Sequence, residues 1–192
     1  MAQKLILPIN KAVITAGFKN ANYKKQFGFV HYGVDMVEQN GTTTVWGSGK
    51  GTVIAKGYDN VLGNVVVVKY LDVQLKDGTV VKGVIQRIFH LSSINVIVGQ
   101  AVTKDTVLGK YGNTGIYSAG AHLHVEFDTD LNYPTYSPTL SGSSNIIKAG
   151  TDTVLNPVNV MFVKKTTPDF QTVTGSSSSD ARTAADSAYA SY

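Results

Sequence analysis

The sequence predicts an all-β protein with a two-layer antiparallel, sandwich-like core and few, short helices. Between residues 49 and 108, short runs rich in β-branched side chains are separated by glycines and by Asp-Gly or asparagine-containing turns, which is typical of successive strands. Before Thr151 no stretch combines a helical period with caps at both ends. With 192 residues, of which 43% are hydrophobic and 16% charged, the chain has the length and composition of one globular domain.

The individual strands follow from the β-branched runs and the turn residues that bound them. They are expected at 52–55, 64–70, 80–85 and 96–99. The valine run at 65–68 lacks clean alternation and therefore suits a strand covered on both faces. The tetrapeptide Lys-Asp-Gly-Thr at 76–79 is the strongest hairpin signal, because Asp-Gly supplies the positive φ angles of tight turns. Residues 133–138 and 141–144 are rich in Pro, Ser and Gly and are expected to form a loop.

The composition changes after residue 163. Four consecutive serines at 176–179 are typical of a flexible linker, and the alanine-rich stretch 181–190 is compatible with a helix. We therefore expect one folded domain over residues 1–163 and a Ser/Ala-rich, flexible linker or tail over 164–192.

Charge and composition exclude several classes of function. The chain has no cysteine, so a metal must be bound by imidazole and carboxylate groups rather than by thiolates. The net charge of +4 favours an anionic environment, but the lysines are scattered, so a nucleic-acid partner is not expected. The N-terminal apolar run ends at Pro8, which is too early for a signal peptide, and no stretch reaches the ~18–20 apolar residues of a membrane span.

The histidines suggest a metal site. His122 and His124 are separated by one residue in a strand-like stretch, so their side chains point to one face and can reach one small volume. Asp35 follows His31 by four residues, and Gly33 between them lets the backbone turn so that the pair can converge on one ion. Two imidazoles and one carboxylate leave a position of a tetrahedral zinc open for water, as in catalytic sites.

Simpler explanations exist for each motif taken alone. A His-x-x-x-Asp spacing is common by chance. His-x-His in a strand also suits a copper or iron site, or a structural pair. The remaining histidine, His90, fits a partly buried residue with a backbone partner.

The order of the motifs resembles one family. His-x-Gly-x-Asp at 31–35, His-Leu-Ser at 90–92, Gly-Asn-Thr-Gly at 112–115 and His-Leu-His-x-Glu at 122–126 are similar to the pattern of the lysostaphin-type, LytM-like zinc endopeptidases, which cleave peptidoglycan cross-links. The similarity runs from about Ile14 to Phe127 and includes smaller features such as Ile-Thr-Ala-Gly-Phe at its start.

The resemblance implies a site and an activity. His31, Asp35 and His124 would hold one Zn²⁺, and His90 and His122 would stand beside the metal-bound water as catalytic residues in a groove lined by loops. The domain over 1–163 would be the catalytic domain of a monomeric zinc metalloendopeptidase. Its partners would be peptidoglycan peptides at the bacterial cell wall, outside the cell, and an antimicrobial phage endolysin would fit the expected lack of a signal peptide.

Two departures from the family pattern bear on substrate preference. The family usually has Tyr-x-His-Leu-Ser, whereas here Ile88 and Phe89 precede His90, so the tyrosine is absent. The stretch 71–87 is longer than a minimal family hairpin. A cupin is disfavoured because only Val125 separates His124 from Glu126, and cupins place three or four residues there. The remaining alternative is a non-catalytic cell-wall-binding or phage structural β-domain.

Overall fold

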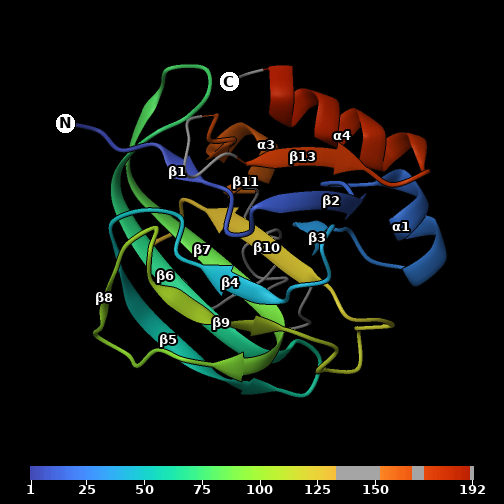
Figure 1. Cartoon of the computed structure of the whole chain (residues 1–192), viewed down its shortest axis with the longest axis horizontal. Coiled ribbons are helices and arrows are strands. Elements are labelled where there is room, and N and C mark those ends of the chain that lie inside the picture. Colours follow the sequence, from blue (N-terminus) through green and yellow to red (C-terminus); the bar gives the residue numbers. More distant parts are fainter. Residues whose placement is uncertain (133–151, 166–170, 191–192) are drawn as a thin grey trace.

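The computed structural model describes residues 1–132, 152–165 and 171–190 (Figure 1). These residues form an eleven-stranded sheet, a two-stranded sheet and three helices. The predicted all-β, sandwich-like fold class is therefore confirmed. The loop predicted at 133–138 and 141–144 lies outside the described residues.

Eight strands form the main path of the large sheet. In spatial order they are β13 (Thr172–Gly175), β2 (Lys11–Ala16), β3 (Val34–Glu38), β10 (Leu123–Asp128), β7 (Val80–Ile94), β6 (Gly63–Gln74), β5 (Gly51–Asp59) and β8 (Ala101–Val102). Three strands attach beside this path: β4 (Thr44–Trp46) pairs with β9 (Val107–Tyr111), β9 pairs with β7, and β11 (Val154–Leu155) pairs with β10. The β13–β2 pair is parallel, so the sheet is mixed rather than purely antiparallel.

The strands β4 and β9 cross over the part of the sheet formed by β5, β6 and β7 and supply a second layer (Figure 1). Val45 and Leu108 from this layer join Val66 and Ile88 of the sheet in one buried apolar core. The small parallel sheet of β1 (Leu5–Ile6) and β12 (Met161–Phe162) adds Leu5 to the same core. This core fixes β7 and β10, which carry His90 and His124.

The Asp-Gly signal forms the hairpin between β6 and β7, as predicted. Gly78 has a φ of 90° and its N–H donates to the carbonyl of Leu75 at 3.0 Å. The N–H of Leu75 in turn donates to the carbonyl of Thr79 at 2.8 Å. Only the glycine takes a positive φ, so the turn is a three-residue loop with glycine in the left-handed position.

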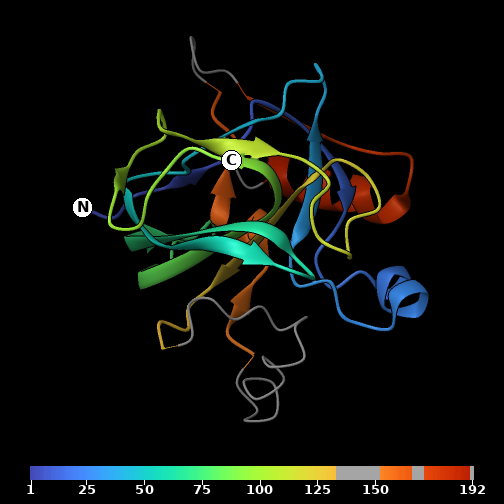
Figure 2. The same ribbon diagram turned by 90° about the horizontal axis from the view of Figure 1, so that it is seen from below.

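The helices are short, as predicted. The first, α1 (Ala21–Phe27), begins at Asn20, whose Oδ1 accepts from the N–H groups of Asn22 (2.8 Å) and Tyr23 (3.3 Å). It ends at Gly28, which is left-handed. None of its residues is buried, and it stands at the edge of the molecule in both views (Figures 1 and 2). The second is α3 (Pro157–Val160), and the third is α4 (Ser179–Ala190).

Among the described residues, no helix is long and apolar enough to cross a membrane.

The expectation of a flexible tail is wrong for the described part of the C-terminal segment. β13 lies parallel to β2, with Val173 beside Ala12, and adds an edge strand to the sheet. α4 follows, and its Ala181, Ala185 and Ala188 are buried in the core (Figure 1). The serine tract looks like a linker by composition, yet the strand before it and the helix after it are both packed. The assignment of 1–163 as a self-sufficient catalytic domain stays a prediction.

An ion cluster lies at the centre of the sheet, where every residue of β10 is buried. Arg87 of β7 donates through Nε to Glu126 at 2.9 Å and through Nη2 to Asp128 at 2.7 Å. All three side chains are fully buried. Because charges without partners in a protein interior are very unfavourable, removal of one member would leave the others as uncompensated buried charges.

Replacing Arg87 by Ala leaves two buried carboxylates without their cation. We expect a loss of about 3–5 kcal/mol in the free energy of unfolding, measured by denaturant titration followed by circular dichroism. Lys82→Ala removes an exposed lysine that pairs with Asp72 at 3.0 Å on the neighbouring surface, and this control should unfold as the parent chain does. Equal stability of the two variants would contradict a central role for the cluster.

Candidate metal centre

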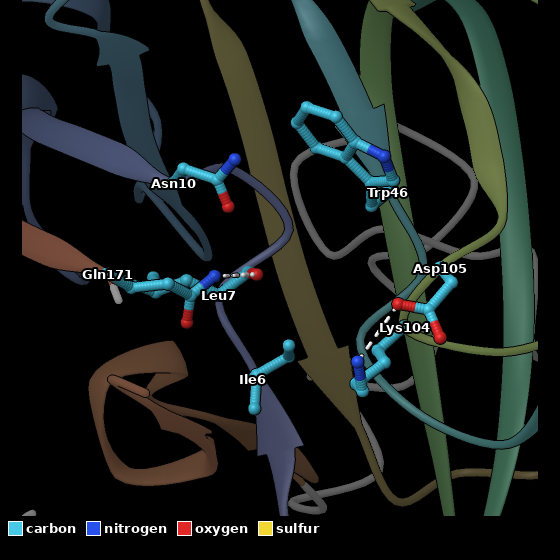
Figure 3. Close-up of a pocket in the computed structure, with 7 residues that line it drawn as sticks. All are labelled: Ile6, Leu7, Asn10, Trp46, Lys104, Asp105 and Gln171. Carbon is cyan, nitrogen blue, oxygen red and sulfur yellow. Dashed lines mark hydrogen bonds and ion pairs between the residues drawn. The ribbon is translucent and has the colours of Figure 1, made fainter. Parts of the chain in front are cut away.

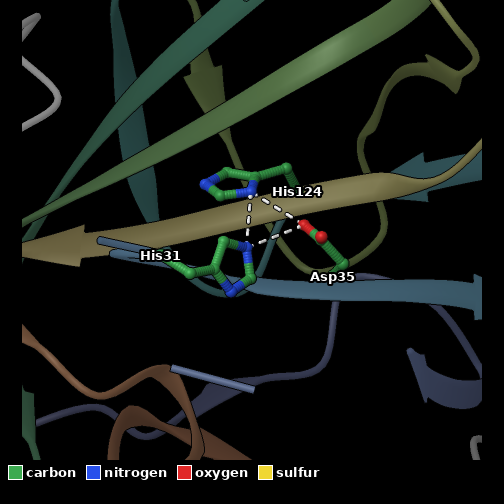
Figure 4. A group of neighbouring side chains, drawn as sticks. All are labelled: His31, Asp35 and His124. Carbon is green, nitrogen blue, oxygen red and sulfur yellow. Dashed lines mark hydrogen bonds and ion pairs between the residues drawn. The ribbon is translucent and has the colours of Figure 1, made fainter. Parts of the chain in front are cut away.

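Three proton-accepting atoms converge where β3 pairs with β10 (Figure 4). His31 Nε2 lies 3.1 Å from Asp35 Oδ1 and 3.2 Å from His124 Nδ1, and His124 Nδ1 lies 2.8 Å from the same oxygen. Asp35 on β3 and His124 on β10 are register partners in an antiparallel pair, so their side chains are neighbours across the strands. His31 reaches them from the segment just before β3.

Gly33 is required by close packing rather than by a turn. A Cβ at this position would lie 2.4 Å from His124 Nε2 and 2.6 Å from the carbonyl oxygen of Val125. The backbone does bend at Gly33, as expected, but without a positive φ, so the bend alone does not require a glycine. The glycine instead lets the β3 strand approach the ring of His124.

The second ring nitrogen of each of these histidines is held by an acceptor. His31 Nδ1 lies 2.7 Å from the carbonyl oxygen of Gly17, which can only accept, so Nδ1 carries the proton. His124 Nε2 lies 3.2 Å from Glu126 Oε1 and donates to that carboxylate. In the neutral rings, the lone pairs of His31 Nε2 and His124 Nδ1 therefore face each other and the Asp35 oxygen.

Such a group needs positive charge among its atoms. Burial raises the pKa of Asp35, but the charge of His31 and the hydrogen bonds of His124 and His31 hold that pKa well below its usual range. Burial lowers the pKa of His124, but hydrogen bonds to Asp35 and Glu126 raise it to about 9. Without a metal, a proton on His124 supplies the charge that a cation would supply.

The three atoms fit zinc. The ligand atoms of a tetrahedral zinc with bonds of about 2.0–2.1 Å lie about 3.3 Å apart. The observed separations of 2.8, 3.1 and 3.2 Å are close to that value before any cation draws the ligands into place. Two nitrogens, one oxygen and acceptors behind the rings are the donor set and outer support of a catalytic zinc site.

His122 and His90 lie beside the group. His122 Nδ1 donates to the carbonyl of Gly120 at 2.7 Å, and its Nε2 lies 3.6 Å from Asp35 Oδ1. His90 Nδ1 donates to the carbonyl of Thr114 at 2.8 Å. The His90 and His122 ring centroids are 4.8 Å apart. The structure thus brings together all five residues singled out from the sequence.

A kink in β7 aims His90 at the site. His90 has a φ of 63°, a left-handed conformation that is uncommon outside glycine. The register between β6 and β7 shifts at this point, between the pairs Asn64–Leu91 and Val66–Ile88. Burial lowers the pKa of His90 to about 4, with a further contribution from the charges of His124 and His122, so its ring is neutral at neutral pH.

Sequence reasoning missed the residues that support the histidines. Glu126 belongs to the quoted His-Leu-His-x-Glu motif and contacts His124 from two residues further along β10. Its ion pair with Arg87 follows only from the β7–β10 register. Tyr23 of α1 stacks on His31, with ring centroids 4.3 Å apart. Its helix had a sequence signal, because Asn20 and Gly28 are typical cap residues.

An aromatic cluster extends from this stack along the edge of the site. Phe29 stacks on Tyr117 with centroids 4.8 Å apart, and Phe27 packs on Tyr23 at 4.5 Å. Phe27 and Tyr117 are both exposed. The cluster therefore offers an apolar surface next to the metal centre.

A separate pocket of about 250 Å³ opens near the other end of β2 (Figure 3). It lies beside Asn10 and Trp46, and its charged residues Lys104 and Asp105 pair with each other at 2.9 Å. The amide of Gln171 is bound to the carbonyl of Leu7 at 2.9 Å. None of the residues that line this pocket is a histidine.

Comparison with known proteins agrees with this site. The model of peptidase family M23 matches residues 29–134, which include all five site residues. Lysostaphin of Staphylococcus staphylolyticus is 32% identical over 115 residues, which are 55% of this chain and 22% of lysostaphin, so the chain corresponds to about a fifth of that relative.

Solved structures show the same fold. The catalytic domain of the antimicrobial peptidase lysostaphin from Staphylococcus simulans has a TM-score of 0.50 and 27% identity, over 77% of this chain and 89% of that domain. A zinc-containing peptidase from Vibrio cholerae has a TM-score of 0.50 and 27% identity, over 66% of this chain and 37% of that one. A chain of the pore-forming SpoIIQ–SpoIIIAH complex, at 23% identity, shares the fold with a TM-score of 0.57 over 84% of this chain and 92% of its own. The family match covers more than half of the sequence and contains the whole metal centre, and the chain therefore belongs to peptidase family M23, the lysostaphin-like peptidases.

Proposed function

We propose that the chain is a zinc-dependent endopeptidase that hydrolyses peptide cross-links of bacterial peptidoglycan. The observation that carries the proposal is the convergence of His31 Nε2, His124 Nδ1 and Asp35 Oδ1, with two further imidazoles beside them. Three ligands leave the fourth position of a tetrahedral zinc for water, which is the arrangement of a hydrolytic site.

Each histidine beside the metal group is prepared to move a proton. When bound, zinc lowers the pKa of a coordinated water and polarises a peptide carbonyl. His90 Nδ1–H donates to the carbonyl of Thr114, and His122 Nδ1–H donates to the carbonyl of Gly120. In each ring, Nε2 is therefore the atom that can accept a proton. One of these Nε2 atoms accepts the proton of the attacking water, steadies the developing oxyanion in its protonated form, and returns that proton to the leaving amine, while the other orients the water.

The substrate class rests on the relatives and on charge. A lysostaphin catalytic domain, described as that of an antimicrobial peptidase, aligns with most of this chain. The net charge of +4 favours attraction to anionic cell-wall polymers. We therefore place the activity at the bacterial cell wall, with peptidoglycan peptides as partners and a monomer as the working form. Digestion of several peptidoglycan types, followed by mass spectrometry of the released muropeptides, tests this and identifies the bond that is cut.

A non-catalytic role is the alternative, and the SpoIIQ–SpoIIIAH complex shows that this fold occurs in an assembly that forms a pore. A domain that only binds a wall or a partner does not need two free imidazoles beside three buried ligands. A zinc-free protein that binds peptidoglycan sacculi without releasing fragments would favour this alternative.

His124→Ala removes one of the three ligands. We expect the parent protein to carry about one zinc per chain and this variant to carry close to none after dialysis, as measured by plasma mass spectrometry. Hydrolysis should disappear with the metal. Lys56→Ala, a change on β5, serves as the control and should keep both. A full zinc complement in His124→Ala would contradict the ligand assignment.

His90→Ala tests the division between ligands and catalytic histidines. Because His90 lies outside the three-atom group, this variant should retain its zinc but lose about 10²–10⁴-fold in turnover, measured on a soluble cross-link peptide. Full activity in this variant would show that the proton-transfer role is wrong.

Zinc affinity should decrease as the pH falls. The pKa of His124 in the metal-free protein is raised to about 9, so below that pH zinc must displace a proton from the ring. The apparent dissociation constant should therefore increase by about tenfold for each unit that the pH falls from 8 to 6, measured by competition with a chelator. An affinity that is constant over this range would contradict the protonated, metal-free state.

A further inference from the structure

We infer that Asp180, at the start of α4, is a positioning residue for the metal centre. It acts indirectly, by holding the turn at residues 17–20 in contact with His31. The inference rests on the proposed function because it concerns a metal ligand. Asp180 lies outside the family match at residues 29–134, whereas the turn begins in the Ile-Thr-Ala-Gly-Phe stretch at 14–18 that resembles the family.

The carboxylate of Asp180 binds the turn at two points. Its Oδ2 accepts from the N–H of Gly17 at 2.6 Å and from Nδ2 of Asn20 at 2.8 Å. Hydrogen bonds to an ionised acceptor are about twice as strong as neutral ones. A Cβ on Gly17 would lie 2.8 and 2.9 Å from the two carboxylate oxygens, so the glycine is needed for the carboxylate to come this close.

The same turn holds His31 by its ring and by its backbone. The carbonyl of Gly17 accepts from His31 Nδ1 at 2.7 Å, which directs the Nε2 lone pair at the other two ligands. The N–H of Lys19 donates to the carbonyl of His31 at 2.6 Å. Lys19 has a φ of 52°, a left-handed conformation that persists only where surrounding contacts enforce it.

A second path runs through Asn20. While its Nδ2 donates to Asp180, its Oδ1 caps α1 by accepting from the N–H groups of Asn22 and Tyr23. Tyr23 then stacks on the ring of His31, with centroids 4.3 Å apart and an interplanar angle of 20°. Asp180 is therefore connected to one face of the His31 ring as well as to its Nδ1.

The helix that carries Asp180 is firmly anchored. Ala181 and Ala185 are buried on its inner side, and a Cβ on Gly175 of β13 would lie 2.5 Å from the backbone of Ala181 and Arg182. Asp180 is in the first turn of α4, where the helix dipole favours a negative charge. The carboxylate is thus presented to the turn by packed structure.

The other ionic contact of the turn cannot replace Asp180. Lys19 pairs with Asp152, but their side chains are 42% and 34% exposed, so solvent screens this pair. Loss of the Asp180 carboxylate leaves Gly17 N–H and the Asn20 amide without their charged partner. The ring of His31 would then lose the support that orients it.

The test uses the full-length protein with zinc as the only probe. Asp180→Ala should increase the zinc dissociation constant by about tenfold, at the lower end of the effect expected for a residue behind a ligand. It should also move the ring-proton chemical shift of His31, which the stacked Tyr23 ring affects, and leave those of His90 unchanged. Asp180→Asn keeps one acceptor oxygen and should fall between parent and alanine variant.

Asp186→Ala is the matched control, because it removes the same charge from an exposed position of the same helix and should behave as the parent. Thermal unfolding of all variants separates positioning from global stability. If Asp180→Ala does not fold, Asp180→Asn decides. Parent-like zinc affinity and His31 shifts in a folded Asp180 variant would overturn the inference. If the parent itself binds no zinc, the proposed function fails, while the His31 shift still tests the contact.

Discussion

Three lone pairs, on His31 Nε2, His124 Nδ1 and Asp35 Oδ1, are held within 2.8–3.2 Å of one another in a buried site. Such atoms repel each other unless a cation or a proton lies between them, and burial removes the water that would otherwise screen the repulsion. The β3–β10 register forces Asp35 and His124 together, and Gly33 allows the close approach. The other ring nitrogens are hydrogen-bonded, His31 Nδ1 to the carbonyl of Gly17 and His124 Nε2 to Glu126. The rings therefore cannot relieve the repulsion by flipping.

The ion cluster of Arg87, Glu126 and Asp128 supports the same site through Glu126. Arg87 neutralises Glu126 and Asp128, and Glu126 at the same time accepts from His124. Without this arginine, the buried carboxylate of Glu126 would lose its charged partner in β7. Stability and metal binding therefore share residues in β7 and β10, and a change intended to affect one will affect the other.

The parts of the site that could be predicted from the sequence are those set by local geometry. Alternation along a strand places His122 and His124 on one face, and the Asp-Gly turn forms the predicted hairpin. The missed features depend on contacts between distant segments. The left-handed His90 depends on a register shift against β6, and Gly33 is required by a ring that lies 91 positions further along the chain at His124. The serine-rich composition predicted a flexible tail, because nothing in it shows that Val173 will pair with the strand formed by residues 11–16.

The docking of the C-terminal segment also affects the order in which the protein folds. Gly17 and Asp180 are separated by 163 positions, so their hydrogen bond closes a loop that spans most of the polypeptide. Contacts of this kind form late, because a long loop must be closed before they stabilise anything. During synthesis, the five residues of the metal centre leave the ribosome well before Asp180. Each nascent chain therefore passes through a stage in which all its ligands are present but Asp180 does not yet hold the turn that orients His31. The final geometry forms only when the C-terminal helix docks.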